Sequence, residues 1–221
     1  FGDGYHGDIA NIGFVIGEQA IAVIDTGGSF KVGQALRKAI RARSSLPIRY
    51  VINTHVHSDH VFGNAAFEQD RPQFIGHERL AGAMRARADA YESNLRKMLG
   101  AAAAGSRIVL PTQSVAAGRA LDLDLGQRRL RLRAWAPAHT DHDLSVFDEQ
   151  SGTLWMGDLL FVERAPSIDG DARGWLEDRW AALTRDCRPL RALPLDADEA
   201  APALQAIRGF SPPDSQIGSI I

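Results

Sequence analysis

The sequence of 221 residues predicts an α/β protein in which two β-sheets lie in the middle and helices lie outside them. Three observations support this prediction. Short segments rich in β-branched residues occur in pairs, and segments with helical spacing separate them. The sequence contains no run of 18 apolar residues, the length needed to cross a membrane. We expect one domain over residues 1–221. Its tail is atypical from about residue 186, where Pro, Ala, Asp and Arg replace the β pattern.

The first half of the chain begins with a predicted hairpin. The stretches "NIGFVIG" (residues 11–17) and "AIAVIDTGG" (20–28) are rich in β-forming residues and flank a short Gly-Glu-Gln turn. Apolar residues at helical spacing predict a helix over 31–43. The run "IRYVINT" (48–54) predicts a buried strand, and the Ala, Arg, Leu and Met of 77–99 predict a helix or a helix pair.

The second half returns to strands. In "RRLRLRAWAP" (128–137), apolar and arginine residues alternate, which is the period of a strand with one face in water. The stretch 143–161 predicts two strands joined by a Ser-Gly turn, and 198–210 predicts a short helix in the tail.

Charge and cysteine content exclude several classes of protein. The formal net charge of −2 gives no general attraction to nucleic acid, and the partner that we expect on other grounds, given below, is a small-molecule substrate. The single cysteine, Cys187, excludes an intrachain disulfide and a cysteine-based metal site. The chain begins at Phe1, so either a leader has been removed or the chain is a fragment.

Four residues of the types that bind metals, three histidines and one aspartate, fall within six positions of "VINTHVHSDHVFGNAAF" (51–67). His55 and His57 follow the predicted strand two residues apart, so both can reach one ion, and imidazole nitrogen is a common zinc ligand. Asp59 and His60 fall in the expected loop after them and can face a second, neighbouring ion. The stretch therefore predicts a metal site for one or two ions.

Two later segments can complete this site. His139 follows the alternating strand in a loop that contains proline and small residues, and Asp158 follows an apolar strand and a glycine. Burying a carboxylate in so apolar a stretch is costly unless it is paired or bound to metal. The remaining histidines are weaker candidates for metal ligands. His142 could lie beside the ligands or at the rim of the site, and His6 could lie at the rim. His77 lies where a helix is expected to begin.

These motifs resemble the metallo-β-lactamase superfamily. The resemblance rests on His55-x-His57-x-Asp59-His60, His139 in "AHTDHDLSV", Asp158 and the early "VIDTGG". Within the superfamily, the sequence most resembles the quinoprotein relay system zinc metallohydrolases. It implies an αβ/βα sandwich with the site at one edge between the sheets. It also implies one zinc on His55, His57 and His139, and a second on Asp59, His60 and a bridging Asp158.

The resemblance implies a zinc hydrolase that uses a metal-bound hydroxide on an ester, thioester or amide, with a β-lactam among the options. Asp59 would be the catalytic residue that orients the hydroxide and carries a proton. Two alternatives stay open. One is a mononuclear iron oxygenase on His55, His139 and Asp158, and the other is a metal-binding module with lost or reduced activity.

The chain departs from the family pattern in its last third. Members usually have a further metal-binding histidine there, but no histidine follows His142, and Cys187 is a poor substitute in an unrelated context. We therefore expect a weaker second zinc site. Arg164 and Arg173 are candidates to bind a substrate carboxylate, and the relatives suggest a periplasmic or secreted protein, with the cytoplasm as the alternative.

Overall fold

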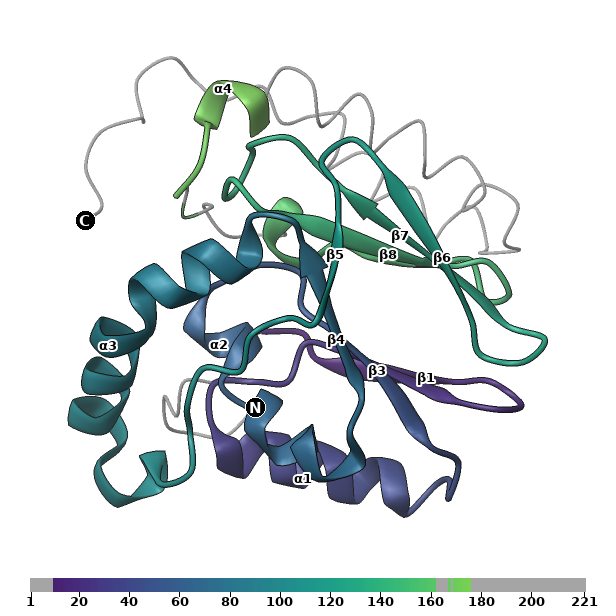
Figure 1. Cartoon of the computed structure of the whole chain (residues 1–221), viewed down its shortest axis with the longest axis horizontal. Helices are drawn as coiled ribbons and strands as arrows, with labels where there is room; N and C mark the ends of the chain where they lie inside the picture. The colour runs from purple at the N-terminus through teal and green to yellow at the C-terminus, as the bar shows by residue number, and fades with distance from the viewer. Residues whose placement is uncertain (1–9, 162–166, 168, 176–221) are drawn as a thin grey trace, which may run out of the picture.

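The computed structural model describes residues 10–161, 167 and 169–175. They form two β-sheets packed face to face, with α1 and α3 on the outer side of the first sheet (Figure 1). This arrangement confirms the α/β class and the two sheets that the sequence predicted. No helix in the described ranges is long and apolar enough to cross a membrane.

The first sheet has five strands in chain order, β1 to β5. The β1–β2 pair is the antiparallel hairpin expected from the sequence, and the other three pairings are parallel. Parallel pairing brings the carboxyl ends of β2, β3 and β4 to one edge of the sheet. The strands are β1 (Gly13–Ile16), β2 (Ile21–Ile24), β3 (Ile48–Ile52), β4 (Gln73–His77) and β5 (Gln113–Val115).

The second sheet is an antiparallel meander of four strands, β6 to β9. Its strand β7 shows the predicted alternation, because Leu130, Leu132 and Ala134 are fully buried whereas Arg129 and Arg131 are exposed. The strands are β6 (Ala120–Asp124), β7 (Arg129–Ala134), β8 (Leu144–Asp148) and β9 (Thr153–Trp155).

The helices connect the strands and cover the first sheet. α1 begins at Phe30 after Ser29, whose side chain accepts a hydrogen bond from the Val32 N–H, a common N-cap. The helices are α1 (Phe30–Arg41), α2 (Ser58–Val61), α3 (Leu80–Leu99) and α4 (Ala172–Gly174), with 3₁₀ turns η1 (Asn64–Asp70), η2 (Gly100–Ala103) and η3 (Gly157–Leu159).

The alternation of side chains along β2 divides the core into two layers. Ile21 and Val23 belong to a cluster with Ile40 of α1, on the helix side of the sheet. Ala22 and Ile24 point the other way and pack in the cluster that contains residues of β7 and β8. Because β2 is buried on both faces, it holds the two sheets and α1 together.

Two local predictions were wrong in detail, and three strands were not predicted. His77 ends β4, and α3 begins only at Leu80, because residues 73–77 pair between β3 and β5. Asp59 and His60 lie in the short helix α2 rather than in a loop. β4, β5 and β6 were not predicted as strands; the structure defines them by their pairing with neighbouring strands.

Candidate metal centre

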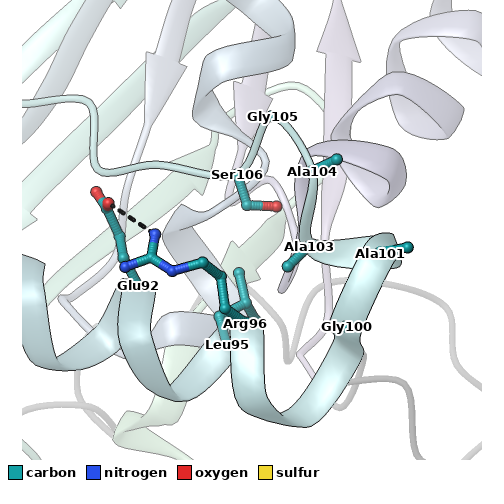
Figure 2. A pocket seen from close by; sticks show the side chains of 9 residues that line it. All are labelled: Glu92, Leu95, Arg96, Gly100, Ala101, Ala103, Ala104, Gly105 and Ser106. Carbon is teal, nitrogen blue, oxygen red and sulfur yellow. Dashed lines mark ion pairs between the residues drawn. The ribbon is translucent and has the colours of Figure 1, made fainter.

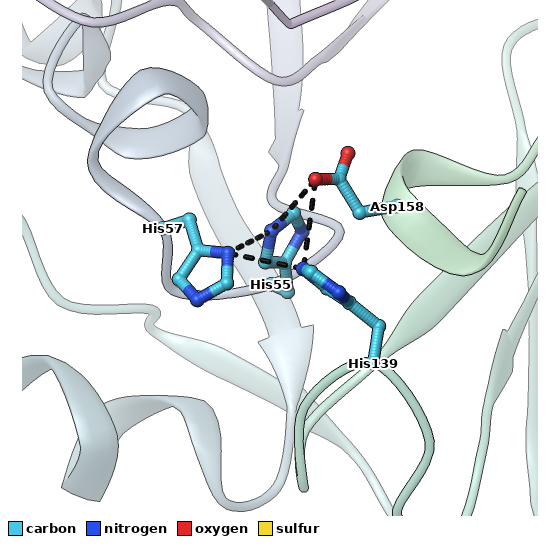
Figure 3. Close-up of side chains that lie close together, drawn as sticks. All are labelled: His55, His57, His139 and Asp158. Carbon is cyan, nitrogen blue, oxygen red and sulfur yellow. Dashed lines mark hydrogen bonds and ion pairs between the residues drawn. The ribbon is translucent and has the colours of Figure 1, made fainter. Parts of the chain in front are cut away.

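The candidate site lies where the two sheets meet at the carboxyl end of β3. His55 and His57 follow β3 directly, His139 lies in the loop between β7 and β8, and Asp158 lies in η3 after β9 (Figure 3). All three loops leave strand ends at the same edge of the sandwich. The structure therefore brings together residues that are more than one hundred positions apart in the chain.

His55, His57, His139 and Asp158 converge on a common point, and their potential ligand atoms all lie within 4.8 Å of one another. His57 Nδ1 lies 3.0 Å from both His55 Nε2 and His139 Nε2 (Figure 3). Asp158 Oδ2 lies 3.5 Å from His139 Nε2 and 3.9 Å from His55 Nε2.

These distances suit a metal ion better than they suit hydrogen bonds alone. Donors bound tetrahedrally at about 2.0–2.1 Å lie about 3.3 Å from one another, within the observed spread. A neutral imidazole carries a single ring proton, so His57 Nδ1 cannot complete good hydrogen bonds to both neighbouring nitrogens. Three nitrogens and a carboxylate oxygen that face one point form a donor set for a divalent cation.

The three histidines of this group favour the neutral form that binds metal. Burial lowers the pKa of His55 well below its usual value, and the neighbouring histidines lower it further. Burial also lowers the pKa of His57, and it lowers the pKa of His139 to about 4. A cation at this point therefore meets lone pairs instead of competing protons.

Asp59 and His60 stand beside this group, next to Asp158. His60 Nε2 lies 3.3 Å from Asp158 Oδ1 and 3.5 Å from Asp59 Oδ2. That nitrogen is buried and makes no hydrogen bond of acceptable geometry among the described residues. The three side chains offer ligands for a second ion that would share Asp158 with the first. Asp158 is less buried than expected, since its side chain is 26% exposed.

Asp25 contacts the second group of candidate ligands, Asp59, His60 and Asp158, through His60. Its buried carboxylate accepts hydrogen bonds from the Thr54 N–H at 2.8 Å, from the Thr54 hydroxyl at 2.7 Å and from His60 Nδ1 at 2.8 Å. The pKa of His60 is affected in both directions: burial lowers it, but the charge of Asp25 and the nearby carboxylates outweigh burial and raise it well above its usual value. Asp25 thereby directs His60 Nε2 toward Asp158.

The other candidate residues do not join the site. His77 Nε2 donates to the Trp135 carbonyl oxygen at 3.0 Å, so His77 connects the two sheets. His142 is fully buried, and its Nδ1 lies 2.9 Å from the Thr140 hydroxyl. Arg173 lies in α4. His6, Arg164, Cys187 and the predicted tail helix fall outside the described residues.

Sequence reasoning missed three residues that surround the site. Asp25 was noted only as part of "VIDTGG", although an aspartate directly after a fully buried strand was a usable signal. Asp169 lies 3.5 Å from His57 Nε2, and Arg87 of α3 lies 2.9 Å from the same carboxylate. No spacing in the sequence indicated these contacts, because they join segments that are 82 and 112 positions apart.

The chain belongs to the metallo-beta-lactamase superfamily, whose sequence model matches residues 6–202. Its fold resembles a metallo-beta-lactamase from Pontibacter korlensis with a TM-score of 0.62 and 18% identity, covering 78% of this chain and 72% of that one. The crystal structure of the metallo-beta-lactamase IND-7 gives a TM-score of 0.63 at 16% identity and covers 81% and 74%.

A third similar structure is an archaeal superfamily protein from Sulfolobus tokodaii, with a TM-score of 0.57, 19% identity and coverage of 80% and 70%. No curated protein sequence matches the chain. At these identities the structures establish the αβ/βα fold. The site geometry adds a group of histidines and an aspartate that could hold a metal ion.

Proposed function

We propose that the protein is a zinc-dependent hydrolase that acts on a small ester, thioester or amide, with a β-lactam among the options. The observation that carries the proposal is the convergence of His55, His57, His139 and Asp158 on one point. Three neutral histidines with a carboxylate favour zinc over the two-histidine, one-carboxylate set that is typical of iron oxygenases. The narrower resemblance to quinoprotein relay system zinc metallohydrolases also supports a hydrolase.

The residues divide into two roles. His55, His57, His139 and Asp158 would hold the first zinc, and Asp59, His60 and Asp158 would hold the second. When bound, zinc would supply a Lewis acid and a water with a pKa lowered to about 7. Asp59 is the carboxylate inside the histidine cluster, and its side chain is 17% exposed. It would orient the attacking water and pass a proton to the leaving group.

An open hollow that reaches the site through Asp169 supports a small-molecule substrate. It lies between α3 and the loops that follow β7 and η3, and its volume of about 450 Å³ is within the range of ligand sites. Asp169 lines this cavity and also contacts His57. A molecule held there would contact Asp169, the neighbour of His57. The charged residues that line the cavity are Arg79, Arg87, Asp141 and Asp169.

The test begins with the metal-free full chain. Zinc is added in steps, and hydrolysis of chromogenic esters, thioesters and β-lactams is measured alongside metal content. We expect activity to need zinc and to fall at least about 10²-fold in the His57→Ala variant. The control is Arg96→Ala, at a surface pair with Glu92 beside a separate hollow of about 230 Å³ (Figure 2). Iron near one equivalent in the purified chain, or no hydrolysis with zinc, would refute the proposal.

A further inference from the structure

The two ring nitrogens of His57 face in different directions. Nδ1 points into the metal group, 3.0 Å from His55 Nε2 and from His139 Nε2. Nε2 lies 3.5 Å from Asp169 Oδ2. A neutral imidazole can offer the Nδ1 lone pair to a metal only when its proton is on Nε2. A carboxylate on the Nε2 side favours that tautomer and limits rotation of the ring.

Asp169 is itself held from two sides. Its backbone N–H donates to the His139 carbonyl oxygen at 2.8 Å, and Asp171 N–H donates to the Ala138 carbonyl oxygen at 2.9 Å. These bonds dock the segment 169–171 on the loop that carries His139. On the other side, Arg87 Nη2 of α3 donates to Asp169 Oδ2 at 2.9 Å.

We propose that Asp169 and Arg87 are positioning residues that hold His57 in its metal-binding tautomer and orientation. Asp169 joins three elements: its carboxylate contacts His57 and Arg87 of helix α3, and its backbone N–H bonds the loop that carries His139. Arg87 and Asp169 are 31% and 45% exposed, and an exposed ion pair contributes little to stability on its own. Their effect should therefore appear in metal affinity and in the state of His57, with little change in the stability of the fold.

The inference rests on the metal-binding part of the proposed function and not on hydrolysis. The metal-free and zinc-titrated full chain are compared in Asp169→Ala, Asp169→Asn, Arg87→Ala and Arg87→Lys. The matched control for Asp169 is Asp122→Ala, since Asp122 is 41% exposed and is paired with Arg131 at 2.9 Å. The matched control for Arg87 is Arg96→Ala, on the same helix and paired with Glu92 at 3.6 Å (Figure 2).

Zinc affinity is measured by competition with a chromophoric chelator. We expect Asp169→Ala to weaken the tight site about 10- to 100-fold, the range seen when an outer partner of a metal-bound histidine is lost. Asp169→Asn keeps an oxygen that can accept the Nε2 proton, so it should recover part of the affinity. Arg87→Ala should lose less than Asp169→Ala, and Arg87→Lys should recover part of that loss. Both controls should bind zinc as the wild type does.

The tautomer of His57 is read from ¹⁵N imidazole spectra of the metal-free chain at about pH 7.5, with thermal unfolding as a check on the fold. The wild type should show the Nε2–H form, and Asp169→Ala should show a mixture of both tautomers. An unchanged tautomer, or wild-type zinc affinity in both Asp169→Ala and Arg87→Ala, would overturn the inference. The spectra need neither zinc nor turnover, so a chain without hydrolase activity would refute the proposed function but still test His57.

Discussion

Replacing Asp25 should destabilise the fold strongly even without metal, because this carboxylate is 1% exposed and accepts three hydrogen bonds. In Asp25→Ala, the Thr54 N–H and His60 Nδ1–H become buried donors without an acceptor. The Thr54 hydroxyl is not counted, because its O–H can rotate and its oxygen can still accept from the His55 Nδ1–H, which lies 3.1 Å away. At about 1–3 kcal/mol for each donor that is left unpaired, the loss should be about 2–6 kcal/mol.

The backbone at Asp25 adds a second cost. Its φ of 52° lies in the left-handed region, where alanine is disfavoured by about 1–2 kcal/mol but asparagine is tolerated. Asp25→Asn should therefore lose only about 1–3 kcal/mol, because its amide oxygen keeps one acceptor in place. The comparison of Ala with Asn separates the effect of the missing acceptor and strained backbone from the effect of the missing charge.

The assay is urea unfolding of the metal-free chain at pH 7, followed by circular dichroism. Metal is left out because a bound ion would stabilise the folded state and hide part of the loss. Natural domains have only about 5–15 kcal/mol to lose, so Asp25→Asn provides a measurable value if Asp25→Ala fails to fold. A loss below about 1 kcal/mol in Asp25→Ala, or a greater loss in Asn than in Ala, would show that this hydrogen-bond network is not needed.

Three further predictions follow from the site and from one ion pair. Asp59→Asn should keep the first-site zinc but reduce kcat by on the order of 10²-fold, since it removes a proton carrier. Steady-state kinetics together with metal analysis checks this. Wild-type activity in the variant would exclude Asp59 from the mechanism. Calorimetry of the metal-free chain should show one tight zinc site and one weak site. The second site has only three protein ligands among the described residues, and it shares one of them, Asp158, with the first site. Two equally tight sites would show that another residue completes the second site. The pair Arg128–Asp148 should stabilise the fold in a pH-dependent way: burial raises the pKa of Asp148, but Arg128 and Ser151 outweigh it, so the folded pKa is lowered. A lowered pKa contributes stability above the unfolded value of about 3.9 and loses it as the pH falls through the folded pKa. Arg128→Gln should therefore cost about 1.5–3 kcal/mol at pH 7, with a difference from the wild type that shrinks below about pH 4 in urea unfolding; a difference independent of pH would contradict this assignment.

The parts of the fold that the sequence could predict are those with a strong local period. β7 was predicted because Leu130 and Leu132 alternate with arginines, and α1 because its apolar residues recur at helical spacing. β4 was missed because "QFIGH" has only two strong β-forming residues, Phe74 and Ile75, and becomes a strand by pairing with neighbours far away in the chain. The start of α3 was misplaced for the same reason, since His77 belongs to β4.

The site divides in the same way. His55 and His57 were predictable from their two-residue spacing after a buried strand, and His139 and Asp158 from their places at strand ends. Asp169 and Arg87 were not predictable, because an aspartate near a glycine and an arginine on a helix are ordinary surface residues in sequence. Only the folded structure brings Arg87 of α3 to Asp169 and Asp169 to His57.

The donors of the metal group are split between the two sheets. His55 and His57 come from the half of the chain that forms the first sheet, and His139 and Asp158 come from the half that forms the second. The exposed turn at residues 116–118 is the point where the chain passes from one half to the other. A nick there would leave two fragments that each carry two of these four donors, so neither fragment alone could supply the whole group. An ion bound by this group would therefore hold two halves of one polypeptide together, and its binding would report whether they have docked correctly.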